Sequence, residues 1–266
     1  MEIKDKKVVI ITGASSGIGK ATAEKFVSKN FDVYGLARKP FSVNGVTTIL
    51  CDVEKNEDVT RAVNEIFAKT GKIDILINNA GMGISGSIEF SSLENIEKQM
   101  NINFMGAVRM TKAVLPIMRK QGFGRIINIT SPAGAIFPMP YQAFYATSKA
   151  ALENFTQSLR IEVKPFKIKV CSVVPGDTKT GFTSARIKNT NDSESVYKNE
   201  NISVSRMEKY EQKGIAPSKV ANVIYKSATR KNPPPMVLVG FAYKLYNLAN
   251  KLLPKRFIYW ILPKLY

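Results

Sequence analysis

The sequence predicts an α/β protein built on a doubly wound, mostly parallel sheet of about seven strands, with helices on both faces. Three observations carry this prediction. Short apolar runs, such as KVVIIT at residues 7–12, have the uninterrupted apolar character of buried parallel strands. Segments with helical spacing alternate with these runs, which is typical of strand–helix–strand units. A glycine-rich turn at residues 12–19 separates the first run from the first helical segment.

The elements follow one another in a regular alternation. The expected strands are residues 7–12, 32–37, 46–51, 73–78, 125–131, 167–174 and 236–239. The expected helices are residues 18–29, 57–70, two helices within 93–121, 143–164 and 218–230. Residues 177–214 are polar and are expected to form a long loop. We therefore expect one domain over residues 1–240, followed by a basic amphipathic helical tail at 241–266.

Local signals support individual elements. Residues 18–29 bring Ile18 and Phe26 to one side of a helix. The run IDILIN at 73–78 leads into an asparagine- and glycine-containing turn, and KIKVCSVV at 167–174 is followed at once by Pro-Gly. Such turn residues are typical of strand ends, so both runs are predicted to stop there.

Composition excludes several classes of function. The 266 residues include 39 Lys and Arg against 21 Asp and Glu, a formal net charge of +18, and no histidine. Without histidine, Ser-His-Asp and Cys-His catalysis and histidine metal sites are excluded. Cys51 and Cys171 are expected to be buried and reduced, and no cluster has metal-ligand spacing, so no metal is predicted. We expect a cytoplasmic protein, because residues 8–11 are too short a run for a signal peptide and lysines interrupt the tail.

The turn T-G-A-S-S-G-I-G spans residues 12–19, after an apolar strand and before a helix, which is the context of a dinucleotide pyrophosphate site. Gly13 permits the tight turn, Gly17 lets the backbone approach phosphate, and Gly19 lets the helix lie close to the sheet. The cofactor-binding residues expected here are Gly13, Ser15, Ser16, Gly17, Ile18 and Gly19. An ordinary strand-to-helix turn is the alternative interpretation.

The end of the second strand predicts which cofactor binds. An Asp or Glu there usually holds the adenosine ribose of NAD, but this chain has Ala37 followed by Arg38. The planar guanidinium of Arg38 suits a phosphate, and Ser15 could donate a further hydrogen bond. We therefore predict NADP (NADPH/NADP+), with a surface charge as the alternative role for Arg38.

Two further strand ends add expected cofactor contacts. Asp52, followed by Val53, ends the third strand and is predicted to hold the adenine amino group or, as the alternative, to cap a turn. Asn79, Ala80 and Gly81 end the fourth strand at the carboxyl edge, where open α/β sheets bind ligands.

Tyr145 and Lys149 lie four residues apart on the predicted helix 143–164, so their side chains share one face. A cation beside a phenol favours the phenolate, and we expect Lys149 to lower the pKa of Tyr145. The pair predicts proton transfer through Tyr145 together with hydride transfer at a nicotinamide. An ordinary pair of surface side chains is the alternative.

Taken together, these segments resemble the short-chain dehydrogenase/reductase family in its common single-domain, Rossmann-like form, over roughly residues 5–240. The resemblance is carried by residues 12–19, Asp52-Val53, residues 78–81, Asn103-Phe-Met-Gly106, Ser131, Tyr145-x-x-x-Lys149 and Pro175-Gly176. Within this family the chain resembles the hydroxysteroid and retinol types and the carbonyl-reducing members.

The resemblance implies a role for each matching residue. Tyr145 would be the general acid and base, Lys149 would bind the nicotinamide ribose, and Ser131 would orient the substrate oxygen. Asn103 would organise a water relay that reaches Lys149. The nicotinamide end would be met by Pro175, Gly176, Thr178 and Thr180.

Two positions leave alternatives open. Ser131 lies one residue farther from Tyr145 than is usual in the family, and counting back from Tyr145 reaches Pro132, which cannot donate a hydrogen bond. We choose Ser131, because it ends a strand and the loop after it can absorb one residue. Asn101 is the alternative to Asn103 in the relay.

The residues expected near the substrate are apolar or aromatic: Met82, Ile84, Ile136, Phe137, Met139, Tyr141 and Phe182. They predict a lipophilic alcohol or carbonyl substrate of steroid, retinoid or long-chain type, although core packing is the alternative for half of them. The resemblance implies that residues 177–214 cover this substrate. The alternatives are a 3-oxoacyl-carrier-protein reductase, whose basic rim docks an acidic carrier, and a catalytically silent NADP-binding sensor or scaffold.

The tail interleaves lysines with aromatic and aliphatic residues, and no Asp or Glu follows Glu211. Such a segment either docks on its own domain or a partner subunit, or contacts an anionic membrane surface peripherally. Nucleic acid is not expected as a partner, because no nucleic-acid-binding motif accompanies the charge. The resemblance implies a homodimer or homotetramer formed through helices near residues 104–121 and 143–164.

Overall fold

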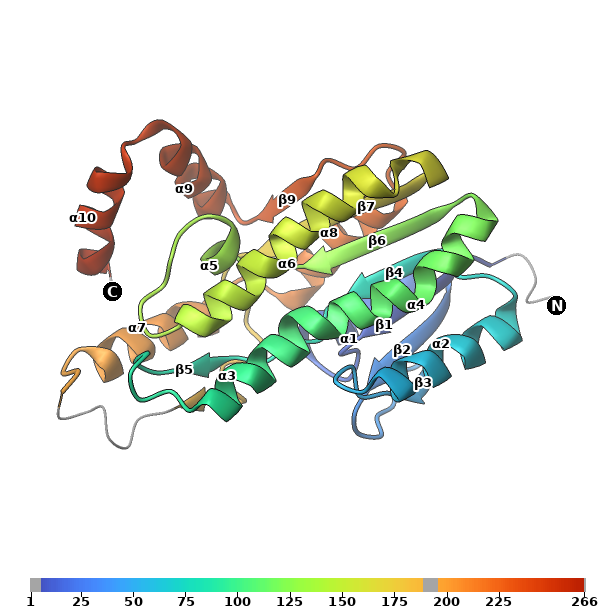
Figure 1. Ribbon diagram of the computed structural model, residues 1–266, viewed down its shortest axis with the longest axis horizontal. Helices are drawn as coiled ribbons and strands as arrows, with labels where there is room; N and C mark the ends of the chain where they lie inside the picture. The colour runs from blue at the N-terminus through green and yellow to red at the C-terminus, as the bar shows by residue number, and fades with distance from the viewer. Residues whose placement is uncertain (1–5, 189–195, 266) are drawn as a thin grey trace.

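A computed structural model of the chain describes residues 6–188 and 196–265 (Figure 1). The predicted domain, polar loop and tail each include residues outside these ranges, namely 1–5, 189–195 and 266. Seven strands form one sheet in which each strand runs parallel to its neighbours. The predicted doubly wound parallel sheet is confirmed.

The direction in which successive strands are added to the sheet reverses next to β1. In sheet order the strands are β3 (Val46–Leu50), β2 (Asp32–Ala37), β1 (Val8–Thr12), β4 (Ile75–Asn78), β6 (Gly124–Ile129), β7 (Ile168–Pro175) and β9 (Met236–Val239). The chain moves outward from β1 to β3 and then returns to the other side of β1 with β4. A crevice opens at the carboxyl ends of the strands at such a reversal, and ligands of doubly wound sheets bind there.

Helices cover both faces of the sheet, with a hydrophobic cluster under each layer. On one face lie α2 (Asn56–Thr70), α4 (Gly106–Gln121) and α6 (Ala143–Glu162), and on the other lie α1 (Gly17–Val27) and α8 (Pro217–Thr229). The inner strands are buried on both sides, as the burial of all five β1 residues illustrates. This two-sided burial explains why the strands are continuous apolar runs in the sequence.

Three segments differ from the sequence prediction. Residues 93–121 form α3 (Leu93–Met100), a π-helix at Asn101–Met105 and α4 in one continuous run. Residues 177–214, expected to be a loop, contain the two-residue strand β8 (Ile187–Lys188), which pairs with β5 (Ile84–Ser85), and the helix α7 (Glu200–Gln212). After β6 the chain forms the single turn α5 (Pro132–Ala135). The loop expectation was wrong for α7 because its sequence is mostly polar, and only Val204 and Met207 supply buried apolar side chains.

The tail consists of α9 (Phe241–Leu252) and α10 (Lys255–Leu265), which form a hairpin beside α5 (Figure 1). The Tyr243 hydroxyl donates to Asp177 Oδ2 at 2.7 Å, and Asn250 Nδ2 donates to the Ile136 carbonyl at 2.7 Å. Tyr243 also covers Gly176, where a Cβ would meet its ring at 2.1 Å. The tail therefore docks on the domain next to the carboxyl end of β7. Within residues 6–188 and 196–265, no helix is both long enough and apolar enough to cross a bilayer.

Candidate active site

A cleft of about 1230 Å³ runs along the carboxyl edge of the sheet from the glycine turn to the tail. Its walls come from the ends of β1, β2, β4, β6 and β7, the start of α6, and the two tail helices. Predicted site residues that line it are Gly13, Ser15, Ser16, Gly17, Ile18, Arg38, Asp52, Val53, Asn79, Ala80, Gly81, Ser131, Tyr145, Lys149, Pro175, Gly176, Thr178 and Thr180. Gly19 and Asn103 lie behind the wall.

The glycine turn has the shape that a dinucleotide phosphate requires. Gly13 and Gly17 have φ angles of +65° and +53°, a left-handed conformation that favours glycine. A Cβ at Gly19 would lie 2.1 Å from the Gly13 carbonyl oxygen, so only glycine lets α1 approach the turn this closely. The side chain of Ser16, the residue before α1, makes no capping hydrogen bond, so the first amides of the helix face the cleft. These residues fit a nicotinamide dinucleotide.

At the adenosine end, Arg38 lines the cleft directly after β2. Its side chain is 57% exposed, and its guanidinium lies 3.8 Å from the Glu54 carboxylate, too far for a strong ion pair. Asp52 Oδ1 accepts a hydrogen bond from the Glu54 amide at 3.1 Å, so this side chain shapes a turn while it lines the cleft. Sequence reasoning did not find Glu54.

Asn79 and Thr12 join the ends of the two central strands. Asn79 Nδ2 donates to the Thr12 carbonyl at 3.0 Å and to the Gly13 carbonyl at 3.3 Å. Thr12 Oγ1 accepts hydrogen bonds from the amides of Asn79 and Ala80, both at 3.0 Å. These four hydrogen bonds hold the glycine turn against the end of β4, and both segments line the cleft.

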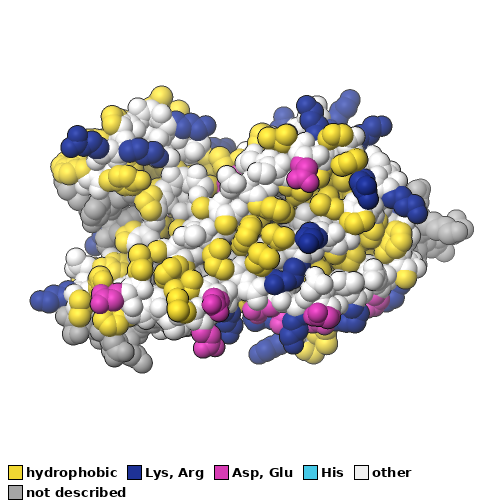
Figure 2. All heavy atoms as spheres, in the orientation of Figure 1, with side chains coloured by type: hydrophobic (Ala, Val, Ile, Leu, Met, Phe, Trp, Pro, Cys, Tyr) yellow, Lys and Arg dark blue, Asp and Glu magenta, His cyan; other side chains and the backbone are white. Residues whose placement is uncertain are grey.

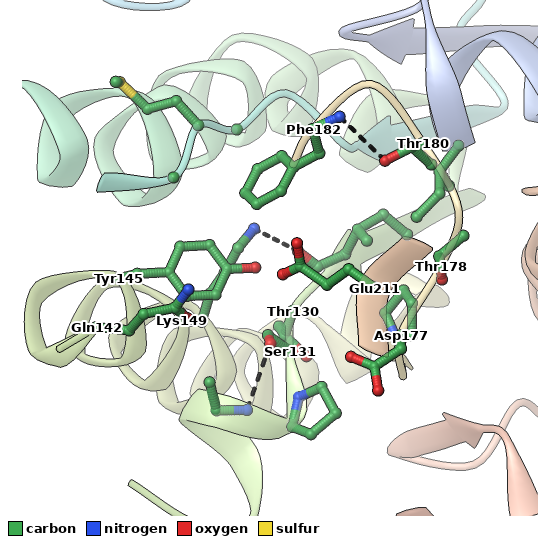
Figure 3. A pocket seen from close by; sticks show the side chains of 18 of the residues that line it. Thr130, Ser131, Gln142, Tyr145, Lys149, Asp177, Thr178, Thr180, Phe182 and Glu211 are labelled. Atoms are coloured by element: carbon green, nitrogen blue, oxygen red, sulfur yellow. Dashed lines mark hydrogen bonds between the residues drawn. The ribbon is translucent and has the colours of Figure 1, made fainter. Parts of the chain in front are cut away.

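Ser131 and Tyr145 face one another at the centre of the cleft (Figure 3). Ser131 is the residue before α5, and its Oγ accepts a hydrogen bond from the Ala133 amide at 3.3 Å. Burial raises the pKa of Tyr145 to about 12, and a hydrogen bond with Ser131 acts in the opposite direction. The loop between them contains the turn α5 and a left-handed Tyr141 (φ 58°). The forward count to Ser131 therefore identifies the hydroxyl that meets Tyr145.

Lys149 does not act on Tyr145 as predicted. Its Nζ donates to the Ile129 carbonyl at 2.9 Å and lies 6.0 Å from the centre of the Tyr145 ring. Burial lowers the pKa of Lys149 to about 8, because the buried ammonium loses its hydration. Lys149 is not among the causes that shift the pKa of Tyr145, so the expectation that Lys149 lowers this pKa is wrong.

Asn103 is held inside the π-helix. Its Oδ1 accepts from the Met82 amide at 2.8 Å, and its Nδ2 donates to the Met82 carbonyl at 2.9 Å and to Ser148 Oγ at 3.0 Å. A Cβ at Gly81 would lie 3.3 Å from Asn103 Oδ1 and 3.5 Å from Lys149 Nζ, so both groups approach Gly81. Asn101, the alternative, instead donates to Glu54 at 3.3 Å. Asn103 therefore positions the segment after β4 next to Lys149.

The apolar residues predicted near the substrate divide into two groups. Met82, Phe137, Met139 and Phe182 line the cleft. Ile84 and Ile136 are buried away from it, and Tyr141 contacts Tyr197 ring to ring at 6.4 Å, so the expectation for these three was wrong. Tertiary structure brought Ile84 into the short pairing with β8, which the sequence did not indicate.

Sequence reasoning missed several polar residues at the substrate end. Gln142, Asp177 and Glu211 line the cleft around Tyr145 and Ser131 (Figure 3). The position of Gln142 one helical turn before Tyr145 was a usable signal. Glu211 had none, because it belongs to a helix that was not predicted.

The arrangement supports transfer of a proton to or from a substrate oxygen. A bound nicotinamide supplies or accepts the hydride at the substrate carbon. The Tyr145 hydroxyl, whose pKa is high, remains protonated at neutral pH and can donate its proton to a carbonyl oxygen. Ser131 beside it can donate a second hydrogen bond to the same oxygen and stabilise its developing charge.

Comparisons with known proteins agree with this chemistry. The profile of the short chain dehydrogenase family matches residues 7–191. The chain is 45% identical to a 3-ketodihydrosphingosine reductase of Bacteroides thetaiotaomicron over 249 residues, which cover 89% of this chain and 91% of that protein. A solved short-chain dehydrogenase from Streptomyces avermitilis has a TM-score of 0.83 at 27% identity, with 98% of this chain and 96% of that chain covered. ElxO, solved with bound NADP, has a TM-score of 0.74 at 27% identity, with 90% and 99% covered.

The fold, the cleft and these relatives define an oxidoreductase that uses a nicotinamide cofactor. More closely, the chain belongs to the short-chain dehydrogenase/reductase family, as its motifs predicted. Similar folds have been solved with NAD as well as with NADP, so the family by itself leaves the choice of cofactor open.

Proposed function

We propose that this protein reduces a long-chain 2-amino ketone of the 3-ketodihydrosphingosine type, with NADPH as the hydride donor. Tyr145 donates the proton to the ketone oxygen, and Ser131 holds that oxygen. Of the three lipophilic classes that the sequence suggested, this is the long-chain one. The similarity to a 3-ketodihydrosphingosine reductase supports it, and one feature of the cleft carries the argument.

That feature is the apolar passage beyond Tyr145. The tail helices α9 and α10 supply its wall with Tyr246, Ala249, Leu253, Phe257, Ile258 and Ile261. Phe137 from the loop after α5 packs edge-on against Tyr246 at 6.2 Å, which joins the domain to this wall. An alkyl chain that leaves the ketone in this direction stays out of water, and each buried methylene contributes about 0.8 kcal/mol.

A substrate series tests the proposed function. With NADPH, kcat/KM is expected to rise by up to about fourfold per methylene as the alkyl chain of a 2-amino-3-ketone is lengthened, until the passage is filled. Tyr145→Phe should abolish this reduction while NADPH still binds. A rate that is independent of chain length, or higher activity on a 3-oxoacyl carrier-protein thioester, would reject the proposal.

Two matched variants test whether the substrate contacts the tail in this passage. Ala249→Phe narrows the passage, whereas Leu248→Phe changes the neighbouring residue, which is 51% exposed and does not line the cleft. We expect the first variant to lose activity on long-chain ketones but not on short ones, and the second to behave like the wild type. Equal losses in both would show that the tail does not contact the substrate.

The preference for NADP rests on Arg38. Its guanidinium is exposed at the adenosine end and has only a long contact with Glu54, so it is available for a 2′-phosphate. Arg38→Asp is expected to weaken NADPH binding by about 1–3 kcal/mol, or roughly 5- to 160-fold, with little effect on NADH. Lys39→Asp makes the same charge change outside the cleft and serves as the control. Equal weakening of both cofactors would remove Arg38 from the phosphate site.

We also propose that the tail contacts an anionic bilayer, from which a long-chain substrate would enter. The helices α9 and α10 expose Phe241 (84%), Leu252 (73%) and Trp260 (61%). Figure 2 shows Lys and Arg side chains beside hydrophobic ones on the lobe that these helices form. This combination is typical of interfacial helices on anionic lipid.

Vesicle sedimentation tests the membrane contact. The protein should sediment with phosphatidylglycerol-containing vesicles but not with phosphatidylcholine alone, and less so after Lys244→Glu with Lys251→Glu. The same charge change at the exposed Lys219 and Lys226 of α8 is the control. Equal loss in both double variants would mean that overall charge, and not the tail, attracts the vesicles.

A homo-oligomer through α4 and α6 is proposed on the basis of their exposed surface. Hydrophobic side chains gather over these two helices in Figure 2, and Ile161 is 75% exposed. Burial of such a patch favours association with a second copy. Sedimentation velocity should give a dimer or tetramer, and a monomer at all concentrations would reject this assembly.

A further inference from the structure

Two carboxylates lie at the substrate end of the cleft in a protein whose net charge is +18. Asp177 follows β7, and Glu211 lies in the last turn of α7. In Figure 3 the Glu211 carboxylate points toward the Tyr145 hydroxyl, in the space where a substrate carbonyl would lie. A carboxylate at this place opposes the formation of a phenolate, so it works against the proton transfer unless a cation joins it.

Two hydrogen bonds hold the Glu211 carboxylate in place. Its Oε1 accepts from Arg186 at 2.5 Å, and its Oε2 accepts from Thr183 Oγ1 at 2.7 Å. Arg186 is buried, with 1% of its side chain exposed, and also lies 3.7 Å from Glu208. A carboxylate can accept about four hydrogen bonds, so Glu211 has capacity left on the cleft side.

The charge of Arg186 does not cancel that of Glu211 at the reacting centre. Phe182 contacts both Tyr145 and Arg186, because its ring lies 5.8 Å from the Tyr145 ring and 5.7 Å from the Arg186 guanidinium. Glu211 raises the pKa of Tyr145 more than Arg186 lowers it. Tyr145 therefore experiences a net negative field from this side.

Gln142 supplies an independent observation on the other side of Tyr145. Its side chain is 4% exposed and lines the cleft, and within the described residues its side-chain amide makes no hydrogen bond to the protein, whereas its backbone amide donates to the Met139 carbonyl at 3.3 Å. Figure 3 shows Gln142 and Glu211 on opposite sides of the Tyr145 ring. The Gln142 side-chain amide is not among the buried polar atoms that lack a partner, so it is open to the cleft, and its donor and acceptor are available to a ligand.

We propose that Glu211 binds the ammonium group, and Gln142 the neighbouring hydroxyl group, of a substrate whose ketone is held by Tyr145 and Ser131. This inference rests on the proposed function and identifies what selects a 2-amino ketone within it. The ammonium is attached to the carbon next to the ketone, so it lies beside the ketone oxygen and within reach of a carboxylate that faces Tyr145. Asp177, whose Oδ2 accepts from Tyr243, adds negative charge at the same end.

The experiment compares the amino ketone with the same ketone lacking the amino group, using the full-length protein and NADPH. The wild type should prefer the amino ketone in kcat/KM, and Glu211→Gln should reduce this preference by about 10- to 100-fold, which is the effect of a charge-assisted contact. Glutamine can still bond to Arg186 and Thr183, so the anchoring contacts are kept. Gln142→Met should lower kcat/KM for the amino ketone but not for its analogue without the neighbouring hydroxyl.

Glu208→Gln is the matched control. It removes the same charge from the same helix and the same arginine, but Glu208 does not line the cleft. We expect it to keep the preference for the amino ketone. Equal loss of preference in Glu208→Gln and Glu211→Gln would overturn the direct contact.

The outcomes separate this inference from the proposed function. If the wild type reduces both long-chain ketones equally well, recognition of the ammonium is overturned whatever the variants do, although reduction of long ketones stands. If Glu211→Gln folds and keeps the full preference, Glu211 is not the ammonium site. If no long-chain ketone is reduced, the proposed function itself fails.

Discussion

The π-helix at Asn101–Met105 offers a sharp test of how this site is built. Asn103→Leu removes the acceptor of the Met82 amide (2.8 Å) and the donor to both the Met82 carbonyl and Ser148. The carbonyl keeps only a long contact from Gln99 Nε2 at 3.4 Å, and Ser148 keeps its own donation to the Tyr145 carbonyl. One amide is thus left without a partner, and two groups lose a hydrogen bond.

These losses set the expected magnitude. An unsatisfied amide costs about 1–3 kcal/mol and each of the two lost hydrogen bonds about 0.5–1.5 kcal/mol, so the free energy of unfolding should fall by about 2–6 kcal/mol. Asn101→Leu is the control, because it makes the same substitution in the same π-helix and loses only the 3.3 Å contact with Glu54. Its cost should stay under about 1 kcal/mol.

Urea unfolding followed by circular dichroism measures both variants under the same conditions. Asn103→Leu should also bind NADPH more weakly, because Gly81 and Met82 line the cleft next to Lys149. If the two variants lose the same stability, or if Asn103→Leu loses less than about 0.5 kcal/mol, the hydrogen bonds of Asn103 do not hold this segment.

Two other predictions follow from packing and burial. Gly19→Ala places a Cβ 2.1 Å from the Gly13 carbonyl oxygen, so it should abolish cofactor binding in a fluorescence titration. Gly71→Ala is the control, because Gly71 has a φ of +68° and a Cβ there would meet nothing within 4 Å. It should lower the free energy of unfolding by about 1 kcal/mol and leave cofactor binding unchanged. The pKa of Lys149 falls from 10.5 to about 8 on folding, so the unfolded chain binds more protons between these values and stability rises with pH there. Relative to Lys149→Met, the wild type should gain about 3 kcal/mol in free energy of unfolding from pH 8 to 10.5, and a difference that is constant with pH would contradict the burial of this charge.

The order of strands and helices could be predicted because its signals are local. Apolar runs bounded by glycine, asparagine or proline marked all seven strands, and the four-residue spacing of Tyr145 and Lys149 placed both on one helix. The glycine turn could also be predicted from the sequence, because its backbone angles and close packing permit few other residues. Such features depend on neighbours in the sequence and on the repeat of a strand or helix.

What the sequence could not predict depends on contacts between distant segments. The pKa of Tyr145 is governed by how deeply the fold buries the phenol and by its contact with Ser131, not by the nearby lysine that the spacing suggested. Glu211 reaches the cleft because α7 packs there through only a few apolar residues, a pattern too weak to predict a helix.

The sequence by itself determined the fold and the family, and it predicted Tyr145 as the proton-transfer residue, because each of these is encoded in a short motif or a local repeat. Tertiary structure decided the shape and charge of the substrate end. Docking of α9 through Tyr243 and Asn250 places the tail along the apolar passage, and α7 brings Glu211 opposite Tyr145. These features arise when elements far apart in the chain bury surface against one another, and no local pattern records that burial.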